Sequence, residues 1–397
     1  MKTEEYVTAK VVELLEKAGV PREAIRQGHK MWLGGARPFI ADIAIVKDGV
    51  VVAVFEIKPQ ISLLKRIVPH LRGLGLNRYG INYFAIAHDD KNGELIVADV
   101  YAINSGEWSS LDKYIETIHQ RIDRAFNLIG KNANISTIAD YIEAVKLAKN
   151  ERIMCHHEGG IIKFFYRGHR VVNWKLLPAL FRERDRIKTL RTEEEFLLNE
   201  SERLFPSLFS QCSDMAKLSI AQHYEIPTRL LDVSGNALVA LWFAVQSSID
   251  EKAPIDGTVY VFGVSAKTWR TASRLGDTKK RLSKGCLSRA TKPQLVFPSF
   301  QLPRQKMQDG AFYLFTDDGG RGMCSIFSED DYTMIVIDKN NKQNLREELE
   351  EYCNIHKGVL FPESLADFKD KLVRDAQRRI VADSAIKEVE RLRKSHI

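Results

Sequence analysis

The sequence predicts an α/β (α+β) protein with two domains. Segments rich in β-branched residues, such as 39–47 and 50–58, alternate with segments whose apolar residues recur every three or four positions, such as 4–18. The first pattern is typical of strands, and the second is typical of amphipathic helices that pack on a sheet. The chain has 397 residues, more than one hydrophobic core usually serves, so two cores are expected.

The first predicted helix, residues 4–18, begins after Thr3, a residue type that caps helix N-termini well. Its apolar stripe starts beside Glu4, which therefore lies at the edge of the side that faces the core. Glu4 or its neighbour Glu5 can also act simply as a first-turn acid that complements the helix dipole. Both interpretations stay open at this point.

Residues 37–58 predict two strands joined by a tight turn at Asp48-Gly49. With strict alternation, one face of the second strand carries Val50, Val52, Val54, Glu56 and Lys58. A carboxylate and an amine thus lie together at the end of an apolar strand. Such charges are almost never buried without a partner, so a metal ion or an anion is expected there.

The register of this hairpin decides whether Asp42 joins Glu56. A two-residue loop at Asp48-Gly49 would pair Asp42 with Phe55 and direct it to the opposite face. A three-residue loop, residues 47–49, would pair Asp42 with Val54 and place both carboxylates on one face. We predict the second register, because it brings two carboxylates and a lysine within reach of one divalent cation.

Asp42 and the run Glu56-Ile57-Lys58 resemble the core of PD-(D/E)XK nucleases. The stretch RPFIADIAIVKDGVVVAVFEIKP is similar to the N-terminal nuclease domain of type I restriction subunits. The resemblance implies a restriction-endonuclease-like mixed sheet flanked by helices. It also implies catalysis by Asp42, Glu56 and Lys58, with Mg²⁺ or Mn²⁺ held by Asp42, Glu56, Ile57 and an acid of the first helix, Glu4. DNA is the implied substrate, RNA remains open, and a role in defence against foreign DNA follows. An exposed salt bridge on an ordinary strand is the structural alternative.

Basic residues follow this motif, and Lys65 and Arg66 are candidates for phosphate contacts or for a solvated helix face. A strand at 83–88, a hairpin near Asn92-Gly93, and helices at 111–130 and 136–152 are predicted next. Ser136 is the expected cap of the last helix. The predicted divisions are a first domain over 1–131, a helical linker over 132–158, a second domain over 159–375 and a charged C-terminal helix over 376–397.

Four blocks in the second half resemble the FRG domain, which is named for an aromatic-Arg-Gly opening. They contain Tyr166-Arg167-Gly168, the stretch from Gln222 to Asn236, the stretch from Pro303 to Phe312, and Leu360-Phe-Pro-Glu. The resemblance implies a second α+β domain without naming its chemistry. Arg167, at the end of a predicted strand and before a glycine, suits a cation presented to an anionic ligand.

The expected pocket of the second domain combines Arg167 with polar groups at strand ends and helix starts. Its other predicted members are His223, Arg229, Asp232, Ser234 and Gln308. His223 also fits a hydrogen-bonded core residue, and Asp232 fits a structural ion pair with an arginine. The order strand-Arg-Gly, strand-Ser-helix resembles the ADP-ribosyltransferase plan, which implies NAD as a ligand. The final glutamate of that plan has no obvious counterpart here.

Between residues 267 and 306, eleven lysines and arginines stand against one acid, Asp277. Lys279, Lys280 and Arg281 lie at its centre and are candidate nucleic-acid contacts, with a solvated loop as the alternative. The five cysteines lack paired spacing, so a reducing cytoplasm is expected. No apolar run reaches membrane-spanning length, and a homodimer remains open.

Three functional classes follow from these residues. The first is a Mg²⁺-dependent endonuclease whose FRG-like domain senses a ligand, and this is the prediction we favour. The second is an ADP-ribosyltransferase-like enzyme that uses NAD at Arg167. The third is a non-catalytic adaptor that binds nucleic acid.

Overall fold

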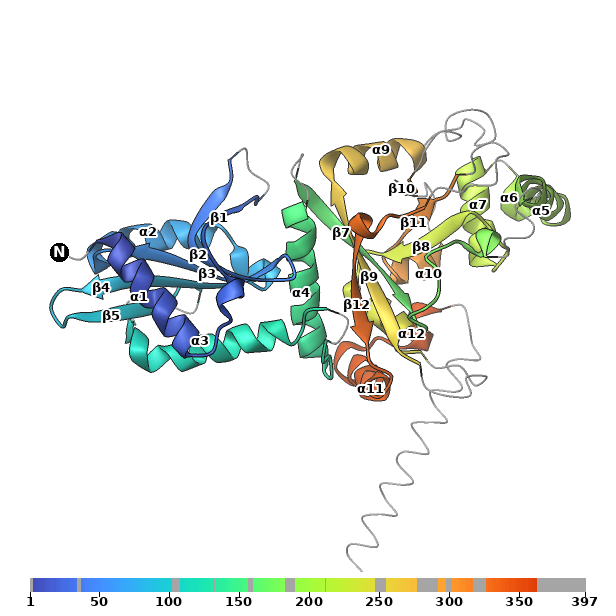
Figure 1. Ribbon diagram of the computed structural model, residues 1–397. Helices are drawn as coiled ribbons and strands as arrows, with labels where there is room; N and C mark the ends of the chain where they lie inside the picture. Colours follow the sequence, from blue (N-terminus) through green and yellow to red (C-terminus); the bar gives the residue numbers. More distant parts are fainter. Residues whose placement is uncertain are drawn as a thin grey trace, which may run out of the picture.

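The computed structural model describes residues 3–33, 37–101, 108–130, 133–155, 160–182, 190–210, 212–246, 255–276, 292–297, 302–316 and 326–362. They form two six-stranded sheets, with helices packed on them (Figure 1). The predicted α+β class is confirmed. The helix predicted over 376–397 lies outside the described residues, as do Lys279, Lys280 and Arg281.

The first sheet has the strand order β1-β2-β3-β4-β5-β6. Its strands are β1 (Ile25–Met31), β2 (Phe39–Lys47), β3 (Val50–Lys58), β4 (Asn82–Asp89), β5 (Glu94–Asp99) and β6 (Ser109–Ser110). β3 and β4 run parallel and the other neighbours run antiparallel, so the sheet is mixed. The connection between β3 and β4 contains α2 (Ile61–Gly73), as parallel neighbours require a crossover.

Helices cover both faces of this sheet. α1 (Glu4–Lys17) and α3 (Leu111–Phe126) bury apolar residues such as Val11 and Ile118 against one face, and α2 packs Leu64 on the other. The predicted cap of α1 is confirmed, because the Thr3 hydroxyl accepts a hydrogen bond from the Tyr6 amide at 3.3 Å.

The second sheet is antiparallel throughout, in the order β10-β11-β8-β7-β9-β12. Its strands are β7 (Ile161–His169), β8 (Leu230–Ser234), β9 (Gly257–Ser265), β10 (Gln294–Val296), β11 (Gly310–Leu314) and β12 (Tyr332–Ile337). The helices of this half are α5 (Leu190–Leu204), α6 (Pro206–Phe209), α7 (Asp214–His223), α8 (Ala237–Ala244), α9 (Ala266–Gly276), α10 (Pro303–Met307), α11 (Lys342–Cys353) and α12 (Lys357–Leu360).

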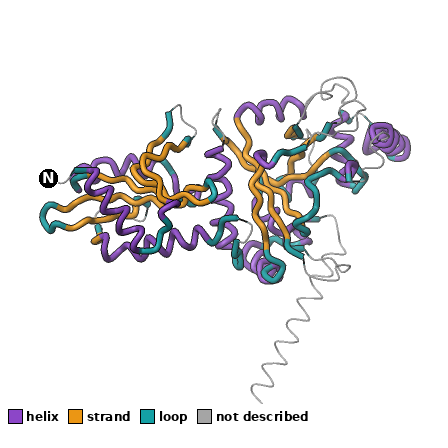
Figure 2. Tube along the Cα trace, viewed as in Figure 1, coloured by secondary structure: helices purple, strands orange, loops and turns teal. Residues whose placement is uncertain are grey.

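One helix, α4 (Ile138–Cys155), stands between the two sheets (Figures 1 and 2). Its buried residues belong to a core that continues from the first sheet into the second. The Asn150 side-chain amide donates to the Val51 carbonyl of β3 at 2.5 Å, and the Tyr141 hydroxyl donates to the Ala237 carbonyl of α8 at 2.7 Å. The segment predicted as a linker therefore contains a helix that packs against both halves.

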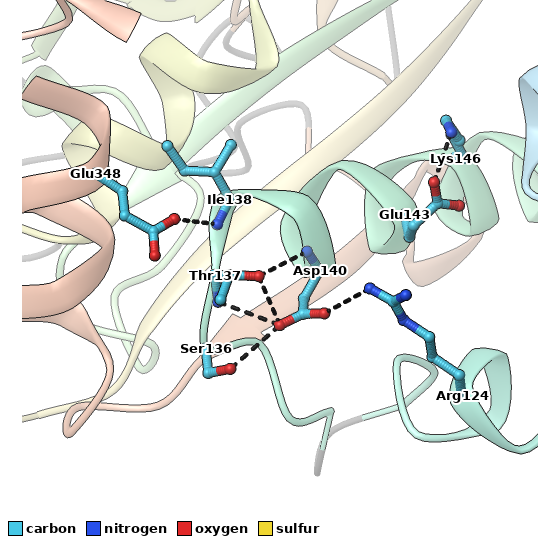
Figure 3. A network of polar contacts seen from close by, with 8 residues as sticks. All are labelled: Arg124, Ser136, Thr137, Ile138, Asp140, Glu143, Lys146 and Glu348. Atoms are coloured by element: carbon cyan, nitrogen blue, oxygen red, sulfur yellow. Dashed lines mark hydrogen bonds and ion pairs between the residues drawn. The ribbon is translucent and has the colours of Figure 1, made fainter. Parts of the chain in front are cut away.

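The N-terminus of α4 is fixed by a network of polar contacts (Figure 3). The Thr137 hydroxyl accepts from the Asp140 amide at 3.2 Å, and the Asp140 carboxylate accepts from the Thr137 amide at 3.2 Å, which makes a reciprocal cap. Thr137, and not Ser136, is thus the cap, because the helix starts at Ile138 and not at residue 136 as predicted. Glu348 of α11 accepts from the Ile138 amide at 2.8 Å and ties this end to the second half.

Candidate functional site

A single lysine at the end of β3 is surrounded by carboxylates from three elements. The Lys58 Nζ lies 2.9 Å from Glu56 Oε1, 3.3 Å from Asp42 Oδ2 of β2, and 3.6 Å from Glu4 Oε1 of α1. The predicted convergence of Asp42, Glu56 and Lys58 is therefore present, and the first helix supplies Glu4 to the same group. One ammonium among three carboxylates leaves the cluster with an excess of negative charge.

The register that produces this cluster is not the one predicted. The turn is a two-residue Asp48-Gly49 loop with Lys47 opposite Val50, and both loop residues have positive φ. A β-bulge then changes the register, so that Ile45 faces Ala53 and Ile43 faces Phe55. The prediction of a three-residue loop was wrong. The bulge nevertheless places Asp42 beside Glu56, because it adds one residue to β3 after the turn.

The extra residue of the bulge is Val52, and burial agrees with this assignment. Val52 and Ala53 both pack in the core on the α1 side, whereas Val54 packs in the core under α2. The strict alternation predicted from Val50 to Lys58 is therefore broken at Val52.

Two asparagine side chains bind the carbonyls of the bulge. Asn82 of β4 donates to the Val52 carbonyl at 3.2 Å, and Asn150 of α4 donates to the Val51 carbonyl at 2.5 Å. Sequence reasoning missed both residues, because each acts through a contact with a strand distant in the chain. Asn150 stands between Lys149 and Glu151 in the sequence, so no local signal marked it as a residue whose exposed fraction is 0%.

Asp42 is held in place by the backbone of β3. Its Oδ2 accepts from the Ile57 amide at 2.6 Å, just beyond the last ladder pair of β2 and β3. The Ile57 carbonyl accepts from Lys58 Nζ at 2.7 Å. Ile57 thus takes part in the cluster through its backbone alone, while its side chain is buried in the core.

Burial and neighbouring charges set the protonation of the cluster. Burial raises the pKa of the Glu56 carboxyl, and Lys58 only partly offsets this effect. For Lys58 burial acts to lower the pKa, but the hydrogen bond and charge of Glu56, with Asp42 and Glu4, outweigh it and raise the pKa. Lys58 therefore stays protonated at neutral pH, and burial makes the ionised form of Glu56 more costly than that of an exposed glutamate.

The donor set fits a small divalent cation. Asp42 and Glu56 already share one cation, the Lys58 ammonium, and carboxylate oxygens are the ligands that Mg²⁺ prefers. In the described part of the chain no three His, Cys, Asp or Glu side chains are grouped closely enough to hold a metal by themselves. Mg²⁺ usually takes one or two carboxylates and completes its shell with water and substrate phosphate.

Exposed cations stand on the helix that follows this motif. α2 begins at Ile61, and Lys65 and Arg66 on its first turns are exposed to solvent. They stay candidate phosphate contacts.

In the second half, Arg167 lies within β7 rather than at its end, because β7 continues to His169. Its Nε donates to His169 Nε2 at 2.9 Å, and its Nη1 donates to the Asp232 carbonyl at 2.6 Å. Gly168 was expected to allow close approach of a ligand. It instead packs against α8, since a Cβ there would lie 1.8 Å from the Ala240 carbonyl oxygen.

Burial lowers the pKa of Arg167 to about 10, although the charge of Asp232 acts in the opposite direction. Burial also lowers the pKa of His169 to about 3, with further contributions from the positive charges of Arg167 and Arg182. His169 is therefore a neutral acceptor for the Arg167 guanidinium. The positive charge at this place belongs to the two arginines.

The other residues predicted for this pocket are placed differently. Ser234 pairs with Tyr166, so its side chain lies on the sheet face opposite to that of Arg167. Its hydroxyl donates to the Gln308 carbonyl at 2.6 Å. Arg229 is held by the buried carboxylate of Glu194, with Nε donating at 2.6 Å. The His223 ring, at the end of α7, packs edge-to-face against the Tyr224 ring. Only Asp232 stays next to Arg167.

The stretch of sequence that contains β7 to α8 matches a known family. Residues 162–253 match the FRG domain. The predicted FRG resemblance is thereby confirmed for this stretch. The sheet that contains β7 and β8 also includes β9, β10, β11 and β12, which lie outside the matched residues. No curated protein and no solved structure matches the chain. Every helix in the described ranges is too short or too polar to cross a lipid bilayer.

Proposed function

We propose that the first domain is a metal-dependent endonuclease that hydrolyses phosphodiester bonds, with the FRG domain as its ligand-sensing module. The observation that carries the proposal is the excess of carboxylate around Lys58. Asp42 and Glu56 converge on one cation, and an additional divalent cation would balance the remaining negative charge.

Each residue has a definite task in this proposal. Asp42, fixed by the Ile57 amide, and Glu56 would hold Mg²⁺ or Mn²⁺, with Glu4 and the Ile57 carbonyl at the margin. The bound ion would polarise the scissile phosphate and lower the pKa of an attacking water. The Lys58 ammonium, charged at neutral pH, would orient that water or offset charge in the transition state.

The proposed substrate is nucleic acid, DNA in the first place. Lys65 and Arg66 would contact its phosphates, and Lys279, Lys280 and Arg281 would add non-specific affinity. A cytoplasmic role in defence against foreign DNA follows from the resemblance to restriction subunits.

Cleavage assays with plasmid DNA and RNA, in Mg²⁺ or Mn²⁺, test the proposal. Asp42→Ala and Lys58→Ala should each abolish cleavage while the circular dichroism spectrum is unchanged. Glu94→Ala, which removes an exposed carboxylate from the same sheet, is the matched control and should cleave normally. Equal cleavage by the wild type and all three variants would refute the assignment.

The FRG domain supports a second candidate, because a largely buried arginine beside β8 is also what an NAD-binding transferase needs. Incubation with NAD separates the two. Nicotinamide release that is lost in Arg167→Lys would move the activity to the FRG domain. Neither cleavage nor release would leave a nucleic-acid-binding adaptor.

A further inference from the structure

The sheet of the FRG domain parts between β7 and β8. These two strands share a single ladder pair, Tyr166 with Ser234, whereas β7 pairs with β9 from Ile161 to His169 and β8 pairs with β11 along its whole length. Beyond Tyr166 the guanidinium of Arg167 joins the two strands by donating to the Asp232 carbonyl. A charged side chain therefore takes the place of backbone pairing at the centre of the sheet.

The Arg167 guanidinium lacks a close anion. Its side chain is 16% exposed, and the nearest carboxylate oxygen among the described residues, Asp232 Oδ2, is 4.0 Å away. It has five N–H donors, of which only two have hydrogen-bond partners in the described ranges. The positive charge of Arg182 also acts on Arg167 and on His169, where it lowers both pKa values. A cation this buried is expected to have an anionic partner, because its desolvation is otherwise not offset.

The neighbouring side chains hold Asp232 away from Arg167. The Gln222 amide nitrogen donates to Asp232 Oδ2 at 2.6 Å, and the Gln222 oxygen accepts from the Thr228 hydroxyl at 2.6 Å. This chain of hydrogen bonds fixes the orientation of Gln222. It keeps the carboxylate from closing on the guanidinium, and it leaves Asp232 as an acceptor that is 53% exposed.

An exposed aromatic ring lies in the same neighbourhood. Trp174 is 42% exposed and its ring contacts His169, the residue that accepts from Arg167. An anion-binding arginine, an exposed carboxylate and an aromatic surface are the groups that recognise phosphate, hydroxyl and base.

We propose that the FRG domain binds a nucleotide between β7 and β8, with its phosphate on Arg167 and Arg182 and a ribose hydroxyl donating to Asp232. The inference rests on the sensor role proposed above, but its test measures binding and not cleavage, so either can fail without the other. Arginine suits this task because its planar fork binds phosphate oxygens in a bidentate manner.

Calorimetry on the full chain with inorganic phosphate, AMP and NAD tests the site. We expect AMP and NAD to bind more tightly than phosphate, and Arg167→Lys to weaken AMP binding by about tenfold or more, the factor that a 1.4 kcal/mol loss represents. Arg203→Lys, which changes an exposed arginine paired with Glu200, is the matched control and should bind normally.

Two further variants give effects of opposite sign, which a purely structural role would not produce. Gln222→Ala frees Asp232 to pair with Arg167 and should weaken phosphate binding. Asp232→Asn removes the competing charge and should strengthen phosphate binding while reducing the preference for AMP. Absence of binding to the folded wild type, or equal affinities of wild type and Arg167→Lys, would overturn the proposal.

Discussion

Each half of the molecule contains one largely buried cation, and the two cations lie in opposite electrostatic surroundings. Lys58 contacts three carboxylates within 3.6 Å, while Arg167 has one carboxylate at 4.0 Å and two hydrogen bonds to neutral acceptors. The first place has surplus negative charge, and the second has surplus positive charge. The same chain can thus attract a metal ion at one sheet and an anion at the other.

This difference also separates what each cation does for the fold. Lys58 neutralises carboxylates that would otherwise repel one another, so the first domain depends on it. Arg167 has no close anion that balances its own charge, so the stability of the FRG domain depends on it less. Removal of Lys58 is therefore expected to cost more stability than removal of Arg167.

The largest expected effect comes from deleting these charges. Lys58→Met should lower the free energy of unfolding by about 2 kcal/mol, less than the 3–5 kcal/mol for fully buried pairs, because Lys58 is 22% exposed. Arg167→Met should cost about 1 kcal/mol, because removal of an uncompensated charge offsets part of the loss of its two hydrogen bonds. Urea unfolding curves, with and without Mn²⁺, provide the measurement.

Unfolding in the presence of Mn²⁺ tests the same difference between Lys58 and Arg167. Mn²⁺ should restore part of the stability lost in Lys58→Met, because a divalent cation can replace the ammonium among the carboxylates. Arg167→Met keeps the carboxylates of the first site, so its stability difference from the wild type should not change with Mn²⁺. Equal losses in the two variants, without any rescue by Mn²⁺, would contradict the charge difference between the sites.

The sequence predicted the partners of the first site correctly but not the way they meet. Asp42, Glu56 and Lys58 could be selected because residue type and strand end are local properties. The bulge at Val52 could not, because it is stabilised by side chains of β4 and α4 that are far apart in the chain. The positive-φ turn at Asp48-Gly49 was visible in the sequence, but local turn chemistry does not report a bulge that follows it.

In the FRG domain, the sequence did not predict on which face of the sheet each side chain lies. Arg167 and Ser234 both stand near strand ends in the sequence, yet ladder pairing sends them to opposite faces. Gly168 looked like a ligand contact because a glycine marks any close approach, and here the approaching group is the backbone of α8. Whether a ligand or another backbone segment approaches a glycine depends on tertiary packing, which leaves no local signal in the sequence.

A second prediction concerns the contact that joins the two halves at the bulge. Asn150→Ala should lower the free energy of unfolding by about 1–2 kcal/mol, since the Val51 carbonyl loses its donor in a buried place. It should also reduce kcat with little change in KM, because the register that sets Asp42 beside Glu56 becomes less fixed.

Asn82→Ala is the matched comparison for Asn150, because it removes the other bulge contact from within the first domain. Similar losses of kcat in both variants would assign the effect to the bulge. A loss of stability without any change in kcat would show that Asn150 only joins the halves. Recovery of activity in Asn150→Gln would indicate that the amide group itself is needed.

The smallest expected effect is a gain of stability. The pKa of Glu56 is raised above its ordinary 4.5, mainly by burial, so the folded state binds more protons than the unfolded state between the two pKa values. Stability therefore falls as pH rises through this window, and the loss is complete above the folded pKa. Lys58 keeps its charge throughout, because its pKa is raised from 10.5.

Glu56→Gln removes this cost, since the amide is uncharged at every pH. The variant should be more stable than the wild type at pH 7, by an amount on the order of 1 kcal/mol, and the difference should vanish near pH 3. Thermal unfolding at both pH values measures it, with Glu94→Gln on the exposed end of β5 as a control that should show no gain. A variant less stable than the wild type at pH 7 would mean that the Glu56 carboxylate is a net stabiliser of the fold. The negative charge would then have no cost that a bound metal ion must offset, and the contrast with Arg167 would lose its physical basis.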